Sequence, residues 1–343
     1  MNTRKIRNME EFAEVSGLSR PTVSKYFNDP DSVRASTRER IEAALEAWDY
    51  RPNIYAVNQN RRLTKNIGVV VPYLADPFFA EIARNIETLV IASGFRPILL
   101  SSHGDPEQEI GNLDSLRSIK PAGVLLAPLG RTSDRARIEA FCESVPTIHF
   151  DSNIRSLGDG FVGHNNIQAT GVMVEYLSRS GEPPVFFEMR NPTNPNANRR
   201  RNAYVETMER LGLTPEILKI DGEGWNFEEI GFRGGLTAIA EGQFVTNTIL
   251  CSNDRLAIGL LAAAYESGLR VGLGSGCALR VAGHDDHPFS RFTCPTLTTV
   301  AQDYAAIAER SVEMLLSLID KGKQPGERPE ILFEGKLVLR ASA

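Results

Sequence analysis

From Ile67 onward, short apolar runs alternate with helix-like stretches, and this alternation constrains the fold more than any other feature of the sequence. Glycine, proline or aspartate bounds the runs IGVVVP, RPILLSS, AGVLLAP, PTIHFDS, PPVFFEM, EILKIDG, NTILCSND, LRVAGHDD and ILFEGKLVLR. Helical patterns separate many of them, such as residues 79–93, 167–180, 200–211 and 254–267. Continuous apolar strands that alternate with helices are typical of parallel sheets covered on both faces.

The length of this region predicts more than one sheet. It spans roughly 275 residues, which is more than one doubly wound sheet usually organises around a single core. We therefore expect an α/β body built of two lobes. Composition agrees, since 42% hydrophobic and 24% charged residues are ordinary for a chain that buries a large core.

The cysteines and the N-terminus indicate the compartment. Cys142, Cys251, Cys277 and Cys294 lie far apart without a C-x-x-C pair, which argues against a disulfide scaffold or a cysteine zinc site. The N-terminus is charged and lacks the apolar segment of a signal peptide. No apolar run approaches the roughly 20 residues that span a bilayer. We expect a cytoplasmic protein with no membrane partner.

The charge is unevenly distributed along the chain. A net charge of −5 by itself argues against nucleic-acid binding. Residues 1–66, however, hold 12 Lys and Arg against 9 Asp and Glu, so they carry +3 and the remainder carries −8. A basic N-terminal segment before an acidic body indicates an attached nucleic-acid-binding module.

The sequence between Met9 and Tyr50 predicts three short helices. The first ends at Gly17 as a left-handed cap, and the second begins after Ser19, whose hydroxyl can cap it. The third starts at Ser36 or Thr37. A helix, a tight glycine turn and a short helix with a basic polar face form a helix-turn-helix, whose second helix enters the major groove of DNA.

The segments FAEVSGLSRPTVSKYFND and VRASTRERIEAALEAWDYRPN resemble the DNA-binding headpiece of the LacI/GalR family of bacterial transcriptional regulators. The A-x-x-x-G-[VL]-S-x-x-T-V-S-[RK] core, the V-x-x-x-T-R start and the Y-x-P-N ending fall at the family spacing without gaps. The resemblance implies that Arg20, Pro21 and Lys25 face base edges. It assigns phosphate contacts to Ser19, Thr22, Ser24, Asn28, Arg34, Thr37 and Tyr50.

Side-chain chemistry supports this assignment. Arginine or lysine can bond guanine O6 and N7 together, which is worth about 1–3 kcal/mol of discrimination. Pro21 has no hydrogen to donate and can only pack, for example on a thymine methyl. We therefore expect Arg20 and Lys25 to carry most of the direct readout.

Residues 53–66 form the expected hinge. The resemblance implies a short helix here that orders when a dimer docks on DNA, with a leucine from each subunit wedged into the minor groove to kink the duplex. Gln59 occupies the position of that leucine. An amide cannot unstack bases as an apolar wedge does, so we expect weaker bending, supported by phosphate contacts from Arg61 and Arg62.

Polar and aromatic residues follow several of the expected strands. Ligands of doubly wound sheets bind beyond the carboxyl ends of the strands. Carboxylates and amides there can bond vicinal hydroxyls, and aromatic faces can cover a sugar ring. This pattern predicts a pocket for a polyhydroxylated molecule.

The LacI/GalR resemblance continues through the body in IGVVVP with DPFF, AGVLL, SNDRLAIG, GHDD and CPTLTTVAQD. It implies two lobes around a cleft, as in periplasmic sugar-binding proteins, with a sugar or sugar derivative as effector. The implied effector contacts are Asp76, Phe78, Phe79, Asp151, Arg200, Trp225, Asn253, Asp285 and Tyr304. Arg199 or Arg201 could replace Arg200 if the loop slips by one residue. We expect one of the two adjacent phenylalanines in the core, and Asp254 as a helix cap.

Motifs for catalysis are weak. The glycine-rich stretch in GLRVGLGSGCALRVAG lies between a helix and a strand, the reverse of the order in a dinucleotide fingerprint. The consecutive residues His284, Asp285, Asp286 and His287 cannot converge on one ion. The sequence shows no serine nucleophile elbow and no P-loop. We expect no enzyme, no catalytic residue, no metal and no cofactor.

The sequence therefore predicts a homodimeric, nucleoid-associated regulator of carbohydrate-related genes, a repressor by family default, on a roughly palindromic operator. Two alternatives stay open: a purine or a phosphorylated or acidic sugar as effector, and a solute-binding protein. The expected boundaries are 1–52 for the headpiece and 53–66 for the hinge. The first lobe takes 67–164 and 297–328, and the second takes 165–296 and 329–343.

Overall fold

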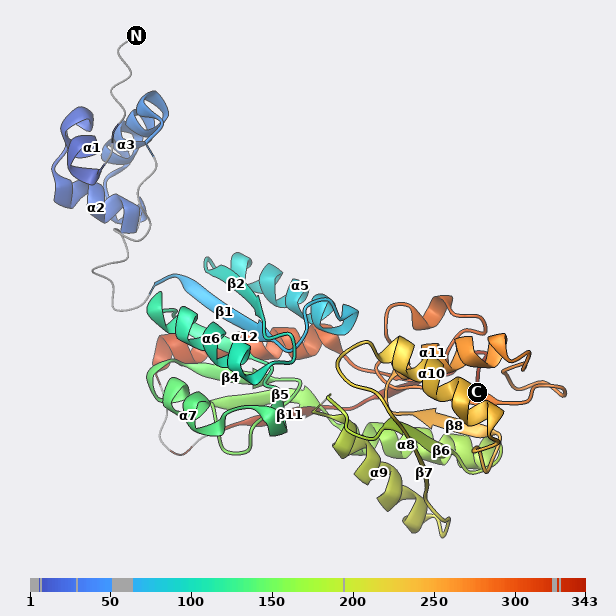
Figure 1. Ribbon diagram of the computed structural model, residues 1–343. Helices are drawn as coiled ribbons and strands as arrows, with labels where there is room; N and C mark the ends of the chain where they lie inside the picture. Colours follow the sequence, from blue (N-terminus) through green and yellow to red (C-terminus); the bar gives the residue numbers. More distant parts are fainter. Residues whose placement is uncertain are drawn as a thin grey trace. The chain divides into compact units, whose positions relative to one another are not determined.

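The computed structural model describes residues 6, 8–28, 30–50, 64–193, 195–322, 326 and 328–343, with Asn28 by its backbone alone. The chain forms two compact units, Met1–Thr64 and Lys65–Ala343 (Figure 1). The expected DNA contacts Gln59, Arg61 and Arg62 lie outside the described residues, as does the Asn28 side chain.

The N-terminal unit contains the three expected helices, α1 (Met9–Ser16), α2 (Arg20–Asn28) and α3 (Ala35–Trp48), with a 3-10 turn η1 (Pro30–Ser32) before the last. Asn8 caps α1 by accepting from the Glu11 amide, and Gly17 closes it at φ 63°. The cap at Gly17 is thus confirmed. Helix α3 begins earlier than Ser36, because Arg34 supplies its extended N-cap.

A small apolar core joins these helices. Phe12, Val23 and Ile41 are fully buried, and the ring of Tyr50 stacks on Phe12 with centroids 4.6 Å apart. Each such side chain contributes about 1.5–3 kcal/mol when it leaves water. Trp48, near the end of α3, is 38% exposed and contributes less to this core.

The second unit contains two parallel sheets, as the apolar runs predict. The six-stranded sheet has the order β11-β5-β4-β3-β1-β2, and the four-stranded sheet has the order β7-β6-β8-β9. The first comprises β1 (Asn66–Val71), β2 (Arg96–Ser101), β3 (Gly123–Leu126), β4 (Thr147–Phe150), β5 (Gly160–His164) and β11 (Glu330–Phe333). The second comprises β6 (Val185–Met189), β7 (Glu216–Ile220), β8 (Thr248–Cys251) and β9 (Arg280–Ala282).

Helices cover both faces of each sheet (Figure 1). Around the first lie α5 (Pro77–Ala92), α6 (Pro106–Ser118), α7 (Arg135–Ser144) and α12 (Tyr304–Lys321). Around the second lie α8 (Asn166–Ser180), α9 (Ala197–Arg210), α10 (Phe227–Ala240) and α11 (Asp254–Glu266). Strand alternation explains this layering: Val69 packs in the cluster with Ile82 of α5, whereas Val70 packs in the cluster with Leu113 of α6. The two-lobed α/β body is therefore confirmed.

The last apolar run of the sequence divides between two sheets. Its first half is β11, which pairs with β5, while its second half, β12 (Lys336–Val338), pairs antiparallel with β10 (Thr299–Ala301). Isolated bridges from Ala282 to Thr298 and from Asp285 to Ala301 connect the β10 region with the second sheet. Two segments therefore lie in the lobe opposite to the one expected. Residues 330–333 join the first lobe because they pair with β5, and residues 299–301 join the second lobe through their bridges to its sheet. The remaining lobe boundaries stay a proposal.

Among the helices of the described residues, none is both long and apolar enough to cross a membrane.

Candidate functional site

Helix α2 presents one face to solvent and one to the headpiece core. Arg20, Pro21 and Lys25 are exposed, whereas Val23 and Tyr26 are buried. The helix contains no acidic residue, so no carboxylate within it offsets the two cations. This basic face has the composition needed for base edges and phosphates.

The residues expected to contact phosphate differ from one another in exposure and in hydrogen bonding. Ser19 Oγ lies 2.8 Å from Thr22 Oγ1 and accepts weakly from the Thr22 amide at 3.4 Å, which holds the start of α2. Ser24 and Thr37 are half-buried, and Arg34 is exposed. Tyr50 is different, because its ring is part of the core. The sequence did not indicate this structural role.

In the second unit, the carboxyl ends of several strands meet at a small pocket between the two lobes. Seven of the nine expected effector contacts line it. The lining residues are Asp76, Phe78, Phe79, Asp151, Arg200, Phe227, Asn253, Arg255, Asp285 and His287. Trp225 and Tyr304 are not among them.

An ion pair joins the lobes at one side of the pocket. Asp76 caps α5 by accepting from the Phe78 amide at 3.0 Å, and its other oxygen lies 2.9 Å from Arg255 at the start of α11. Arg255 also pairs with Glu228 of α10 at 2.6 Å. Burial raises the pKa of Asp76 despite the Arg255 guanidinium. A ligand that separates the lobes must break this pair.

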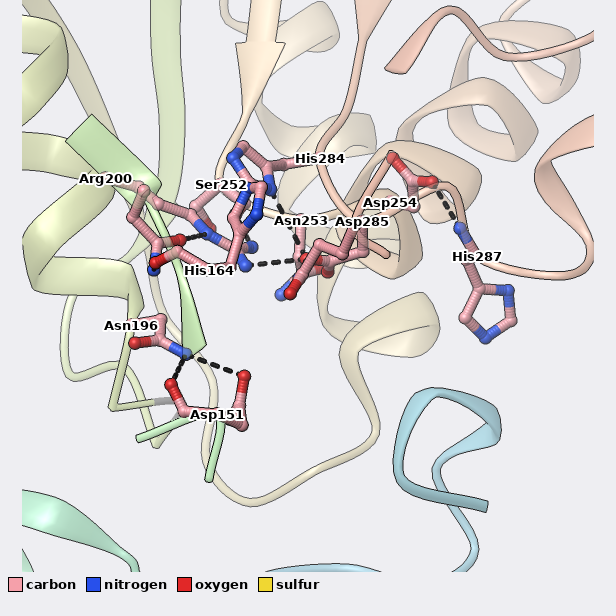
Figure 2. A network of polar contacts seen from close by, with 12 residues as sticks. Asp151, His164, Asn196, Arg200, Ser252, Asn253, Asp254, His284, Asp285 and His287 are labelled. Carbon is pink, nitrogen blue, oxygen red and sulfur yellow. Dashed lines mark hydrogen bonds and ion pairs between the residues drawn. The ribbon is translucent and has the colours of Figure 1, made fainter. Parts of the chain in front are cut away.

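Arg200 holds a second polar network on the floor of the pocket (Figure 2). Its guanidinium is 2% exposed and donates to Asn166 Oδ1 at 2.8 Å, to the Ser252 carbonyl at 2.8 Å and to Asp285 Oδ1 at 2.6 Å. Burial alone would raise the pKa of Asp285, but the Arg200 guanidinium and His284 lower it below its ordinary value. Every nitrogen of Arg200 is therefore committed within the protein.

Asp151 follows β4 and enters the pocket without an ion pair to any described residue. It is 3% exposed, and its Oδ1 accepts from the Asn196 amide nitrogen at 3.0 Å, as does its carbonyl at 3.3 Å (Figure 2). Burial raises the pKa of Asp151 to about 7, with Arg200 opposing this effect. Among the three carboxylates that line the pocket, Asp151 alone has no ion pair to a described residue.

The aromatic side chains near the pocket were predicted only in part. Phe78 and Phe79 both line the pocket, and both are buried in the hydrophobic core, where one of them was expected. Their rings meet edge to face with centroids 4.8 Å apart. Trp225, expected to stack on ligand, instead stacks on Tyr73 of the other lobe at 5.8 Å and is 7% exposed. Its ring covers the junction of the lobes.

Tyr304 does not line the pocket, but it contacts a residue that does. Its hydroxyl donates to the Asp285 carbonyl, while Gln302 donates to Asp285 Oδ1 at 2.7 Å. Burial raises the pKa of the Tyr304 hydroxyl well above its ordinary value, so the hydroxyl remains a donor. Tyr304 thereby positions Asp285.

The expected helix cap at Asp254 is wrong. Asn253 caps α11 by accepting from the Leu256 amide at 2.8 Å. The fully buried Asp254 accepts from Ser290, Thr299 and the His287 amide instead, and burial raises its pKa to about 7. These bonds fasten the loop after β9 to α11.

The four consecutive residues His284 to His287 diverge, as the spacing argument predicts. The ring of His284 lies against His164 with centroids 5.2 Å apart, and Asp286 pairs with Arg340 at 2.6 Å. Figure 2 shows the His287 ring pointing away from Asp285. Burial lowers the pKa of His284 to about 4, so this ring is neutral near pH 7.

Sequence reasoning missed three pocket residues, Phe227, Arg255 and His287. Arg255 stands in the first turn of the helix after β8, inside the SNDRL motif, so its position beyond a strand end was a usable signal. No local pattern marks Phe227, which approaches the pocket through the packing of α10.

Two comparisons with sequence families agree with the two units. Residues 8–53 match the bacterial regulatory proteins of the lacI family, and residues 162–343, just over half of the chain, match the periplasmic binding protein-like domain. The chain is 25% identical over 337 residues to the HTH-type transcriptional repressor PurR of Histophilus somni, with 97% of this chain and 98% of that protein covered. It is also 25% identical over 315 residues to the ribose operon repressor of Escherichia coli, with 91% and 92% covered.

Solved structures agree over the whole length. The Lac repressor bound to ONPG in the repressed state superimposes with a TM-score of 0.82 at 27% identity, covering 99% of this chain and all of that one. The Lac repressor dimer bound to operator and the anti-inducer ONPF gives 0.82 at 26% identity, covering 98% and 99%. With its basic helix-turn-helix and its two-lobed pocket, the chain belongs to the LacI/GalR family and is a DNA-binding transcriptional regulator with a ligand-binding domain.

Proposed function

We propose that this regulator is a cytoplasmic, nucleoid-associated repressor that binds a roughly palindromic operator as a homodimer, and that a small polyhydroxylated effector, a sugar or sugar derivative, controls it. The protein is not an enzyme in this proposal, and it acts on carbohydrate-related genes. The exposed face of α2, with Arg20 and Lys25 over a buried core side, carries the DNA-binding part. A two-fold dimer requires two half-sites.

The pocket supports a polyhydroxylated ligand. Carboxylates of Asp76, Asp151 and Asp285 supply acceptors, Asn253 adds an amide, and Phe78 and Phe79 supply flat apolar faces. Such groups bind vicinal hydroxyls and cover C–H faces. This combination carries the effector part of the proposal.

The alternative of a phosphorylated or acidic effector receives less support. Each nitrogen of Arg200 donates to a protein acceptor, and Arg201 pairs with Glu188 at 3.4 Å. Arg199 bonds to the neutral amides of Asn153 and Asn196. The three consecutive arginines that the sequence offered as an anion site therefore already bond to protein groups. A purine remains compatible with the two phenylalanines.

Control by effector follows from the position of the pocket. Its residues come from both lobes, so a ligand that binds one lobe arrangement better shifts the protein toward it. Because coupling is reciprocal, an effector that weakens operator binding must itself bind the operator complex less tightly.

DNA recognition can be tested without knowing the operator. Rounds of selection from a random duplex library should yield a two-fold symmetric sequence bound by the purified full chain. Arg20→Ala should lose about 1–3 kcal/mol of discrimination at one base pair of each half-site, measured by competition gel shifts. Arg117→Ala, on the exposed face of α6, serves as the matched control. An unchanged preference in Arg20→Ala would refute this assignment.

The hinge proposal has its own measurement. With Gln59 in place of an apolar wedge, gel phasing should show a smaller operator bend than in Gln59→Leu. Equal bending in both proteins would remove the argument. Sedimentation of the full chain with and without the selected duplex tests the homodimer.

An effector screen tests the ligand-binding part. A bound compound raises the melting temperature by mass action. Sugars should raise the melting temperature more than sugar acids, sugar phosphates or nucleobases do. A response to nucleobases alone would favour the purine alternative. A protein that binds compounds but no duplex would instead be a solute-binding protein.

A further inference from the structure

The charges of the pocket do not balance. Three carboxylates, on Asp76, Asp151 and Asp285, line it together with two guanidinium groups, on Arg200 and Arg255. Outside the lining, Glu228 adds a fourth acid through Arg255, and Arg199 adds a third guanidinium near Asp151, so the acids still exceed the cations by one. Burial lowers the pKa of His287, so this ring supplies no compensating charge near pH 7.

The two guanidinium groups are already used. Arg255 is shared between Asp76 at 2.9 Å and Glu228 at 2.6 Å. Arg200 pairs with Asp285 at 2.6 Å, and its other two nitrogens donate to Asn166 Oδ1 and to the Ser252 carbonyl. An anionic group in the pocket would therefore meet carboxylates and no uncommitted cation among the described lining residues.

Asp151 is the acid without a cation. Its carboxylate accepts from the Asn196 amide at 3.0 Å, and that amide is neutral. The charges that act on it are the guanidinium groups of Arg200, which pairs with Asp285, and of Arg199, which bonds to the neutral amides of Asn153 and Asn196. The acids Asp285 and Asp76 repel it. A carboxylate in this position either takes up a proton or pairs with a cation that enters the pocket.

We propose that the effector carries a protonated amine that pairs with the Asp151 carboxylate, so that an amino sugar or another amine-bearing polyol is the ligand class. This inference rests on the proposed effector site and narrows it. Hydroxyl groups of the same ligand would be accepted by the remaining pocket oxygens, and its C–H faces would lie on Phe78 and Phe79. An ammonium supplies up to three donors and the missing charge at once.

Burial supports this choice over a hydroxyl at the same place. Asp151 is 3% exposed, so an ion pair there is poorly screened by salt. Burial disfavours the charged form of Asp151 and raises its pKa to about 7, and a bound ammonium would favour the charged form again. Ammonium binding should therefore lower this pKa and release a proton to solvent near pH 7.

Matched pairs of ligands test the proposal in the full-length protein. The pairs differ by an amine in place of one hydroxyl: Tris against pentaerythritol, D-glucosamine against D-glucose, and D-galactosamine against D-galactose. D-Glucuronate and glucose 6-phosphate represent anions. Calorimetry at pH 8 in amine-free phosphate buffer should show an amine that binds at least about tenfold tighter than its hydroxyl counterpart.

Asp151→Asn separates the charge from the shape. The amide can still accept from Asn196, and the preference for the amine should fall to about twofold or less. Asp114→Asn is the control, because Asp114 is an exposed carboxylate of α6 that pairs with Arg117 and Arg137, and it should keep the full preference. Should Asp151→Asn fail to fold, the unaltered protein gives the answer by pH, since its preference should weaken from pH 8 to pH 6 as Asp151 gains a proton.

Each outcome decides the matter. Tighter binding of hydroxyl or anionic compounds overturns the amine while leaving the effector site in place. A preference retained in Asp151→Asn overturns the role of Asp151. A panel in which nothing binds overturns the inference as well, and operator selection then judges the DNA-binding proposal independently.

Discussion

Two arginines, Arg20 and Arg200, show how differently the two units of this protein prepare for their ligands. Arg20 stands exposed on α2 of the headpiece, where we propose that DNA replaces the water around its side chain. Arg200 is 2% exposed in the body and is fixed by three acceptors. A surface that reads a long polymer can leave its side chains free, whereas a pocket for a small molecule must hold its groups in place beforehand.

The same contrast appears in the cores. The headpiece core contains Phe12, Val23 and Ile41 around the Tyr50 ring, with its basic side chains outside. The body buries charged and titratable groups between its lobes, and these need partners. Substitution of an exposed basic residue in the headpiece should therefore affect binding alone, whereas substitution of a buried pocket residue should affect binding and stability together.

The largest effect is expected at Arg200. Arg200→Met keeps the length of the side chain but leaves Asp285 buried without its cation, which should cost about 3–5 kcal/mol of the free energy of unfolding. Urea unfolding of the body measures it. Arg117→Met, at an exposed ion pair, should change little. A loss below about 1 kcal/mol would mean that the buried network does not stabilise the body.

The next largest effect on the free energy of unfolding is expected at acid pH, through protonation of His149 on β4. This side chain is fully buried, no described residue bonds its ring nitrogens, and burial lowers its pKa from 6.5 to about 3. Because the folded-state pKa lies below the unfolded one, the stabilisation is complete above pH 6.5 and is lost as pH falls toward 3. Between neutral pH and pH 5, the contribution of His149 should lower the free energy of unfolding by about 2 kcal/mol.

His149→Phe should remove that part of the pH dependence. Unfolding curves of the two proteins at pH 7.5 and pH 5 give the comparison, in which the difference between the proteins must change with pH. A difference that stays the same at both values would show that His149 does not titrate on unfolding.

At Arg20 the expected change in stability is small. Arg20→Ala should shift the free energy of unfolding by no more than about 0.5 kcal/mol, because the side chain is exposed, even as operator discrimination falls. Chemical unfolding of the full chain, followed by helix content, checks it. Clear destabilisation would place Arg20 in the structural framework and weaken the contrast with Arg200.

The smallest effect is spectroscopic. Trp48 of the headpiece is 38% exposed and Trp225 of the body is 7% exposed, and the chain has two tryptophans. Trp48→Phe should therefore emit at shorter wavelength than Trp225→Phe. If an effector opens the lobes, emission of Trp48→Phe should move to longer wavelength as Trp225 leaves Tyr73. Identical spectra would contradict the burial of Trp225.

Local sequence determined the headpiece and the positions of most pocket residues. A glycine cap at Gly17, a proline in the first turn of α2 and regular apolar spacing each act within a few residues, so they can be interpreted without tertiary contacts. Asp76, Asp151 and Asp285 were expected because parallel strands bring their carboxyl ends to one edge. Seven pocket residues followed from that rule and the family resemblance.

Tertiary structure decided what those residues touch. The sequence could not show that Asn253 rather than Asp254 caps α11, that Trp225 stacks on Tyr73, or that β11 joins the first sheet. It also left the arginines near Arg200 suited to an anion, until packing gave each of them a protein partner. Partners across long separations depend on which lobes and helices pack together, and that depends on the burial of the whole chain and not on any local pattern.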